Sequence, residues 1–177
     1  MAERAPLSGL VVPVPAAEHL VGGHRSRLDA NAALGVPAHV TALFPFVSPA
    51  DLTADVLTRV ARVVATVPAF HHRFSHTGWF GDDVLFLAPD DPAPLRELTR
   101  RLHREFPDHP PFGGVFTEVV PHLTVGHGHP RAVLAEAEEA VRAGLPVSGH
   151  AAEVHLLAQD QPGGCWRLRE RFPLPRR

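Results

Sequence analysis

The 177-residue sequence predicts one α+β domain that is built from two similar halves. Its length and its hydrophobic content of 45% are sufficient for one well-filled core. Segments with helical spacing of apolar residues alternate with short apolar segments that are typical of strands. Both halves follow the order strand, helix, histidine-containing strand, helix, strand, at similar offsets, which indicates an internal duplication.

The first half is expected to contain three strands and two helices. The second helix is the clearest, because Ser48 is a favourable N-cap, Pro49 suits the first helical position and Pro68 ends the segment. In chain order, the expected elements are a strand at 10–14, a helix at 16–31, a strand at 39–44, a helix at 49–67 and a strand at 70–74.

The second half repeats this order and adds a hairpin. Pro107 ends the first helix of this half, and a loop rich in Pro and Gly follows as far as Gly114. The two lobes would span about 1–80 and 81–177, with strands allowed to exchange between them. The expected elements are a strand at 84–87, a helix that opens at 91–92, a strand at 122–126, a helix at 130–144 and hairpin strands at 154–157 and 166–172.

The composition disfavours several classes of protein. The formal net charge is -2, 20% of the residues are charged and no basic stripe is present, so a long duplex nucleic acid is not an expected ligand. Cys165 is the only cysteine, which excludes an internal disulfide and a Cys-rich zinc site. The N-terminal residues lack the layout of a signal peptide, and no apolar run approaches the roughly 18 residues of a membrane span. We therefore expect a cytoplasmic monomer with no membrane partner.

The two histidine-containing strands share a four-residue motif. Residues i and i+2 of a strand point to the same face, so a His-x-Thr strand sets an imidazole beside a hydroxyl. One His-x-Thr triplet is expected by chance in a histidine-rich chain, whereas two complete copies at equivalent places are not. The motif is a histidine, an apolar residue, a threonine and an apolar residue, and its copies are His39-Val40-Thr41-Ala42 and His122-Leu123-Thr124-Val125.

These side chains suit acid–base chemistry on a phosphate ester. Histidine titrates near neutrality, so one imidazole can accept a proton while the other donates one. In the hydrolysis of a cyclic phosphodiester, one histidine would take a proton from the attacking water and the other would protonate the departing sugar oxygen. The threonine hydroxyls can hydrogen-bond the non-bridging oxygens. Such a site needs no metal ion to activate water, and the sequence does not assign the acid and base roles.

At these motifs the chain resembles the two-histidine (2H) phosphoesterase superfamily, and within it the bacterial 2′-5′ RNA ligase-like proteins. The resemblance covers nearly the whole chain and includes the segments 37–46, 78–80 and 120–125. It implies a bilobal fold in which two antiparallel sheets line a central cleft and helices pack outside. It also implies an RNA-processing cyclic phosphodiesterase without a cofactor, acting on 2′,3′-cyclic phosphates or 2′-5′ linkages of RNA ends or nucleotides. The four motif positions of the family fall on His39, Thr41, His122 and Thr124.

Other residues are weaker candidates. Phe44, Phe46 and Trp79 are suitable for stacking on a substrate base, although core packing is the commoner role of such rings. Histidines cluster at 71–76 and at 122–129, but neither cluster has a carboxylate or cysteine partner at the spacing of metal ligands. The exposed histidine is therefore the default interpretation, and no metal site is expected.

Three functional hypotheses follow from the sequence. The main one is a cyclic phosphodiesterase that uses His39 and His122 as an acid–base pair, with 2′-5′ ligation as a side reaction. The alternative is a module that has the same fold, binds a nucleotide or an RNA end and turns over little substrate. The third is a metal-dependent hydrolase that uses the histidine clusters.

Overall fold

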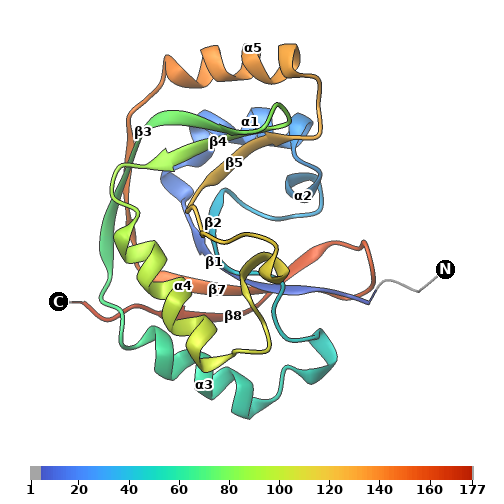
Figure 1. The fold of residues 1–177 in the computed structure, drawn as a ribbon, viewed down its shortest axis with the longest axis vertical. Coiled ribbons are helices and arrows are strands. Elements are labelled where there is room, and N and C mark those ends of the chain that lie inside the picture. Colours follow the sequence, from blue (N-terminus) through green and yellow to red (C-terminus); the bar gives the residue numbers. More distant parts are fainter. Residues whose placement is uncertain (1–4, 177) are drawn as a thin grey trace.

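Two four-stranded antiparallel sheets form the framework of the computed structural model, which describes residues 5–176 (Figure 1). The first sheet has the strand order β2-β1-β7-β8, and the second has the order β5-β4-β3-β6. The expected α+β class with two antiparallel sheets is confirmed. The strands are β1 (Ser8–Pro13), β2 (His39–Leu43), β3 (Phe70–Phe80), β4 (Val84–Pro89), β5 (Leu123–His127), β6 (Val147–Ala151), β7 (Glu153–Gln159) and β8 (Trp166–Pro173).

Two of the helices pack on the opposite sheet from the strand that precedes them. α1 follows β1 of the first sheet but packs against β5 of the second, and α4 follows β4 of the second sheet but packs against β2 of the first (Figure 1). α5 packs beside α1 on the second sheet, and α3 packs beside α4 on the first sheet. Each sheet is therefore covered by one helix from each half. The helices are α1 (Glu18–Leu28), α2 (Ala30–Ala33), α3 (Ala54–Val64), α4 (Ala93–Glu105) and α5 (Arg131–Arg142). None of the helices in residues 5–176 has the length and apolarity needed to cross a membrane.

The two sheets do not correspond to the two halves of the sequence. The expected boundary near residue 80 falls between β3 and β4, which pair with each other in the second sheet. β3 from the first half thus extends the second sheet, and the β7–β8 hairpin from the second half completes the first sheet. One continuous cluster of buried apolar side chains includes residues of both sheets, among them Leu10, Phe74 and Leu156.

Two local differences from the sequence-based expectation have physical causes. Pro49 opens a 3-10 helix of three residues, and α3 begins at Ala54, five residues later than expected. The N-cap of α3 is Thr53, whose hydroxyl accepts a hydrogen bond from the Val56 N–H at 3.3 Å. The sequence also gives no sign of β6, because its residues between Val147 and Ala151 are polar or glycine and are not buried.

Candidate active site

The two motifs lie on the edge strands of the two sheets, and these edges meet. β2 is at one end of the first sheet and β5 at one end of the second, and the two strands contact each other. Val40 and Leu123 are buried, as the alternation of strand residues predicts. The motif histidines and threonines are half-buried, and they are His39, Thr41, His122 and Thr124.

Both histidines make the same hydrogen bond to the backbone. Nδ1 of His39 lies 2.8 Å from the carbonyl oxygen of Pro37, and Nδ1 of His122 lies 2.7 Å from the carbonyl oxygen of Val120. A carbonyl oxygen only accepts, so Nδ1 carries the hydrogen in each case. The partner is in both cases the residue two positions before the histidine. Each neutral ring therefore leaves the lone pair of Nε2 free to accept a proton.

The surroundings make the two imidazoles unequal. The pKa of His39 is lowered to about 4, mainly by burial and to a smaller extent by the Arg25 guanidinium and the His122 imidazole, while the bond to Pro37 and the Asp29 carboxylate oppose this shift. Burial also lowers the pKa of His122 from its usual value, and the bond to Val120 opposes that shift. Because His122 affects the titration of His39, the two rings lie close enough to interact.

Three phenylalanine rings that were not expected at the site surround His122. Phe80 and Phe86 meet its imidazole edge-on, with ring centroids at 4.8 and 5.5 Å, and Phe112 stacks on it at 6.1 Å. Phe112 has a φ of 51°, which is unfavourable for a residue other than glycine, and its N–H donates to the Phe44 carbonyl at 2.6 Å. The loop 111–114 is thereby held against the end of β2, with its aromatic ring on His122.

The three aromatic residues that were expected to bind substrate lie in three different surroundings. Phe46 is only 5% exposed and packs edge-on against Phe106 at 4.9 Å, so its faces are not available to a ligand. The Trp79 indole N–H donates to Glu138 of α5 at 3.0 Å, so this ring lies on the helix-covered face of β3. A shift of one residue decides the face of a strand, which is why Phe80, and not Trp79, reaches His122. Phe44 is half-buried and meets Trp166 edge-on at 6.1 Å.

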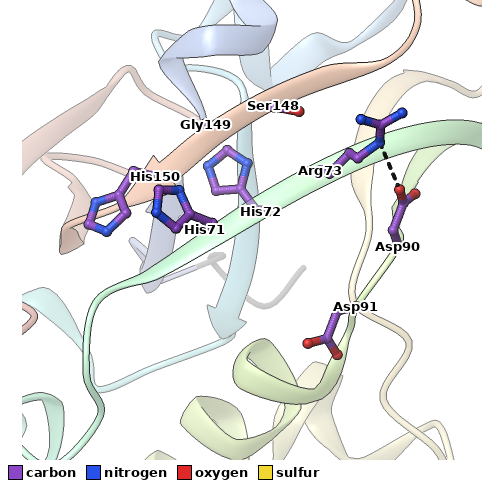
Figure 2. A pocket seen from close by; sticks show the side chains of 8 residues that line it. All are labelled: His71, His72, Arg73, Asp90, Asp91, Ser148, Gly149 and His150. Atoms are coloured by element: carbon purple, nitrogen blue, oxygen red, sulfur yellow. Dashed lines mark ion pairs between the residues drawn. The ribbon is translucent and has the colours of Figure 1, made fainter. Parts of the chain in front are cut away.

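Of the histidines at 71–76, His71 and His72 line a separate pocket of about 620 Å³, to which none of the four motif residues contributes (Figure 2). The rings of His71 and His150 meet there at 4.8 Å, and Arg73 pairs with Asp90 at 3.3 Å. His72 is 8% exposed, burial lowers its pKa, and its ring packs over Gly149. Within residues 5–176, no group of three or more His, Cys, Asp or Glu side chains is arranged to hold a metal ion.

Comparison with known protein families identifies the chain. A model of the 2′-5′ RNA ligase superfamily matches residues 12–163. The chain belongs to this superfamily. The matched segment contains both His-x-Thr motifs and seven of the eight strands in full or in part, from the end of β1 to β7. No curated protein sequence matches the chain significantly.

Solved structures show that the superfamily member has the fold of LigT. The E. coli LigT structure in complex with 3′-AMP aligns over 97% of this chain and 99% of LigT, with a TM-score of 0.60 and 18% identity. TT0787 of Thermus thermophilus aligns over 96% of this chain and 98% of its own, with a TM-score of 0.62 and 18% identity. The likeness extends over both lobes, and it confirms the expected bilobal arrangement.

Proposed function

We propose that this 2′-5′ RNA ligase superfamily member is a metal-independent phosphoesterase that hydrolyses 2′,3′-cyclic phosphates, or 2′-5′ phosphodiesters, of RNA ends or nucleotides. The observation that carries the proposal is the pair of imidazoles on contacting edge strands, each with Nδ1 bonded to the carbonyl two residues earlier. Both Nε2 atoms are thereby available for proton transfer. A half-buried threonine accompanies each histidine.

In this mechanism His39 is the general base and His122 is the general acid. The pKa of His39 is lowered to about 4, so its ring is neutral near neutral pH and its Nε2 can take a proton from water. The water oxygen forms a new bond to phosphorus as the bond from phosphorus to one ribose oxygen breaks. His122 donates its Nε2 proton to that ribose oxygen. The hydroxyls of Thr41 and Thr124 donate hydrogen bonds to the non-bridging oxygens as their charge changes.

The ligands of a structural relative support the substrate class. Structures of E. coli LigT are described as complexes with 3′-AMP, NADP+ and ATP. Each of these molecules is a nucleotide with a phosphate on its ribose. A nucleotide or an RNA end that carries a cyclic phosphate also has a base and a ribose-bound phosphate. We therefore assign the superfamily member a substrate of this class.

Turnover of 2′,3′-cyclic nucleotides in the presence of EDTA tests the proposal directly. We expect the superfamily member to open the cyclic phosphate at the same rate with and without the chelator, because a histidine and not a metal ion activates water. Product formation is followed by chromatography. Loss of activity with EDTA that returns on addition of a divalent metal would show metal-dependent hydrolysis. Tight binding by calorimetry without any turnover would show the binding module instead.

The pH dependence of kcat/KM should follow the two imidazoles. His39 must be neutral, so activity rises as the pH increases through its pKa of about 4. His122 must be protonated, so activity falls as the pH increases through its pKa, which lies below the usual 6.5. We therefore expect a bell-shaped profile for the free enzyme, with its optimum on the acid side of neutrality. Because the two imidazoles interact, the apparent pKa values of the two limbs describe the pair and not one histidine each. A flat profile from about pH 4 to 9, with chemistry rate-limiting, contradicts the mechanism.

A further inference from the structure

A buried arginine supports the segment that holds His39. Arg25 of α1 is 2% exposed, and its Nη1 donates to the carbonyl oxygen of Val36 at 3.2 Å. Its Nη2 donates to Asp29 at 2.8 Å, which fixes the direction of the guanidinium. Val36 is the residue before Pro37, whose carbonyl accepts the hydrogen bond from His39 Nδ1. The arginine therefore acts on the peptide unit next to the one that orients the imidazole.

The second half of the chain has an arginine that makes a similar contact, although it lies near the start of its helix, whereas Arg25 lies in the last turn of α1. Nε of Arg96 on α4 donates to the carbonyl oxygen of Val119 at 3.4 Å, and its Nη2 donates to Glu118 at 3.1 Å. Val119 precedes Val120, whose carbonyl accepts the hydrogen bond from His122 Nδ1. In both halves, an arginine of the longer helix that precedes the motif, α1 or α4, binds the carbonyl three residues before the histidine.

We propose that Arg25 and Arg96 are two positioning residues with the same role, each of which holds the peptide unit next to the backbone carbonyl that orients one of the two histidines. Neither arginine needs to touch the substrate in this role. The inference rests on the proposed function for its effect on turnover, but its effect on the imidazoles is independent of the substrate.

The physical reason is that the carbonyl bound by each arginine and the carbonyl bound by its histidine belong to neighbouring residues. The carbonyl at i−3 and the carbonyl at i−2 belong to consecutive peptide units, and a planar peptide unit rotates as one piece. A guanidinium bound to the first carbonyl holds that unit in place, so the second carbonyl can turn only about φ and ψ of the one residue that joins the two units. A fixed i−2 carbonyl keeps the hydrogen on Nδ1 and keeps Nε2 directed to the reacting group, and misplacement by about 1 Å costs up to about 100-fold in rate.

The two arginines are not equally protected. Arg25 is buried together with Asp29, which is 7% exposed, whereas the side chain of Arg96 is 46% exposed. Removal of Arg25 would leave the buried carboxylate without its partner and would reduce stability. Arg96 is therefore the better position for a test, because its replacement leaves no buried charge behind.

Arg96→Met is the main test, with nitrogen NMR of the histidine side chains as the readout. In the wild type, we expect His39 and His122 to carry their hydrogen on Nδ1. In Arg96→Met, we expect His122 to become a mixture of tautomers while His39 is unchanged, and kcat on 2′,3′-cyclic nucleotides to fall about tenfold with KM nearly constant. Arg25→Lys keeps the charge beside Asp29 but loses the fork that binds two acceptors, and it should alter His39 and not His122.

Arg100→Met and Arg27→Met are the matched controls. Arg100 lies on α4 and bonds to Glu97, and Arg27 lies on α1 and bonds to the Gly23 carbonyl, so neither contacts a motif segment. Both controls should leave the tautomers and kcat unchanged. An unchanged His122 tautomer in folded Arg96→Met, or an equal change in Arg100→Met, overturns the positioning role. A shifted tautomer in a protein that turns over no cyclic nucleotide supports the positioning role and contradicts the proposed function.

Discussion

His39→Ala and His122→Ala should each reduce kcat on 2′,3′-cyclic nucleotides by about 10²–10⁴-fold, which is the range of general acid–base catalysis. Each change removes one of the two Nε2 atoms that transfer a proton and leaves the other in place. The two losses should not add in the double variant, because both groups act in one step. Steady-state kinetics at the pH optimum measures the effect, and a circular dichroism spectrum like that of the wild type shows that the fold is intact.

His71→Ala is a suitable control for this experiment. His71 is an exposed histidine on β3 that lines the separate pocket, and it makes no contribution to the motif pair. Its replacement should leave kcat within about twofold of the wild type, in line with surface substitutions in general. A loss in His71→Ala as large as the loss in His39→Ala would place the reaction in the histidine-lined pocket. Full activity of His122→Ala would rule out the acid–base pair.

Leu123→Ala should lower the free energy of unfolding by about 2–5 kcal/mol, which is the usual cost of this change in a core. Leu123 lies between His122 and Thr124 but is 0% exposed, because it points to the opposite face of β5. Leu123 belongs to the continuous apolar core, so its truncation leaves a cavity there. Urea denaturation measures the loss, and the melting temperature should fall by about 2–4 °C for each kcal/mol.

Thr124→Ala is the matched control on the next residue of the same strand. Thr124 is half-buried on the face of His122, so its truncation should cost about 1 kcal/mol or less in stability while it reduces kcat. Neighbouring residues of one strand would thus separate stability from catalysis. If Thr124→Ala were as destabilising as Leu123→Ala with an unchanged kcat, the threonine would have a packing role and no part in the reaction.

The local chemistry of the motifs was accessible from the sequence because it depends on short-range geometry. Alternation along a strand correctly placed Val40 and Leu123 in the core and the histidines and threonines on the other face. Apart from β6 and the short α2, the order of helices and strands was also predicted, since amphipathic spacing and proline boundaries are local signals. The start of α3 was wrong by five residues, because Ser48 and Thr53 both have the character of an N-cap.

Several features of the site depend on contacts between segments far apart in the chain. Phe86 reaches His122 because β4 pairs with β5, and Phe112 reaches it because its loop bonds to the end of β2. The pairing of Arg96 with Val119 likewise requires that α4 return alongside the segment before β5. None of these long-range contacts produces a periodic pattern in the sequence.

The sequence by itself determined the two His-x-Thr strands, the duplicated order of elements and the α+β class, because each follows from residue types at fixed short spacing. Only the tertiary structure decided that β3 and the β7–β8 hairpin exchange between the lobes and that β2 and β5 meet edge to edge. It also decided that His39 is the more strongly perturbed imidazole. The physical reason is that burial and nearby charge, which make the two rings unequal, come from helices, loops and strands that folding packs around each ring.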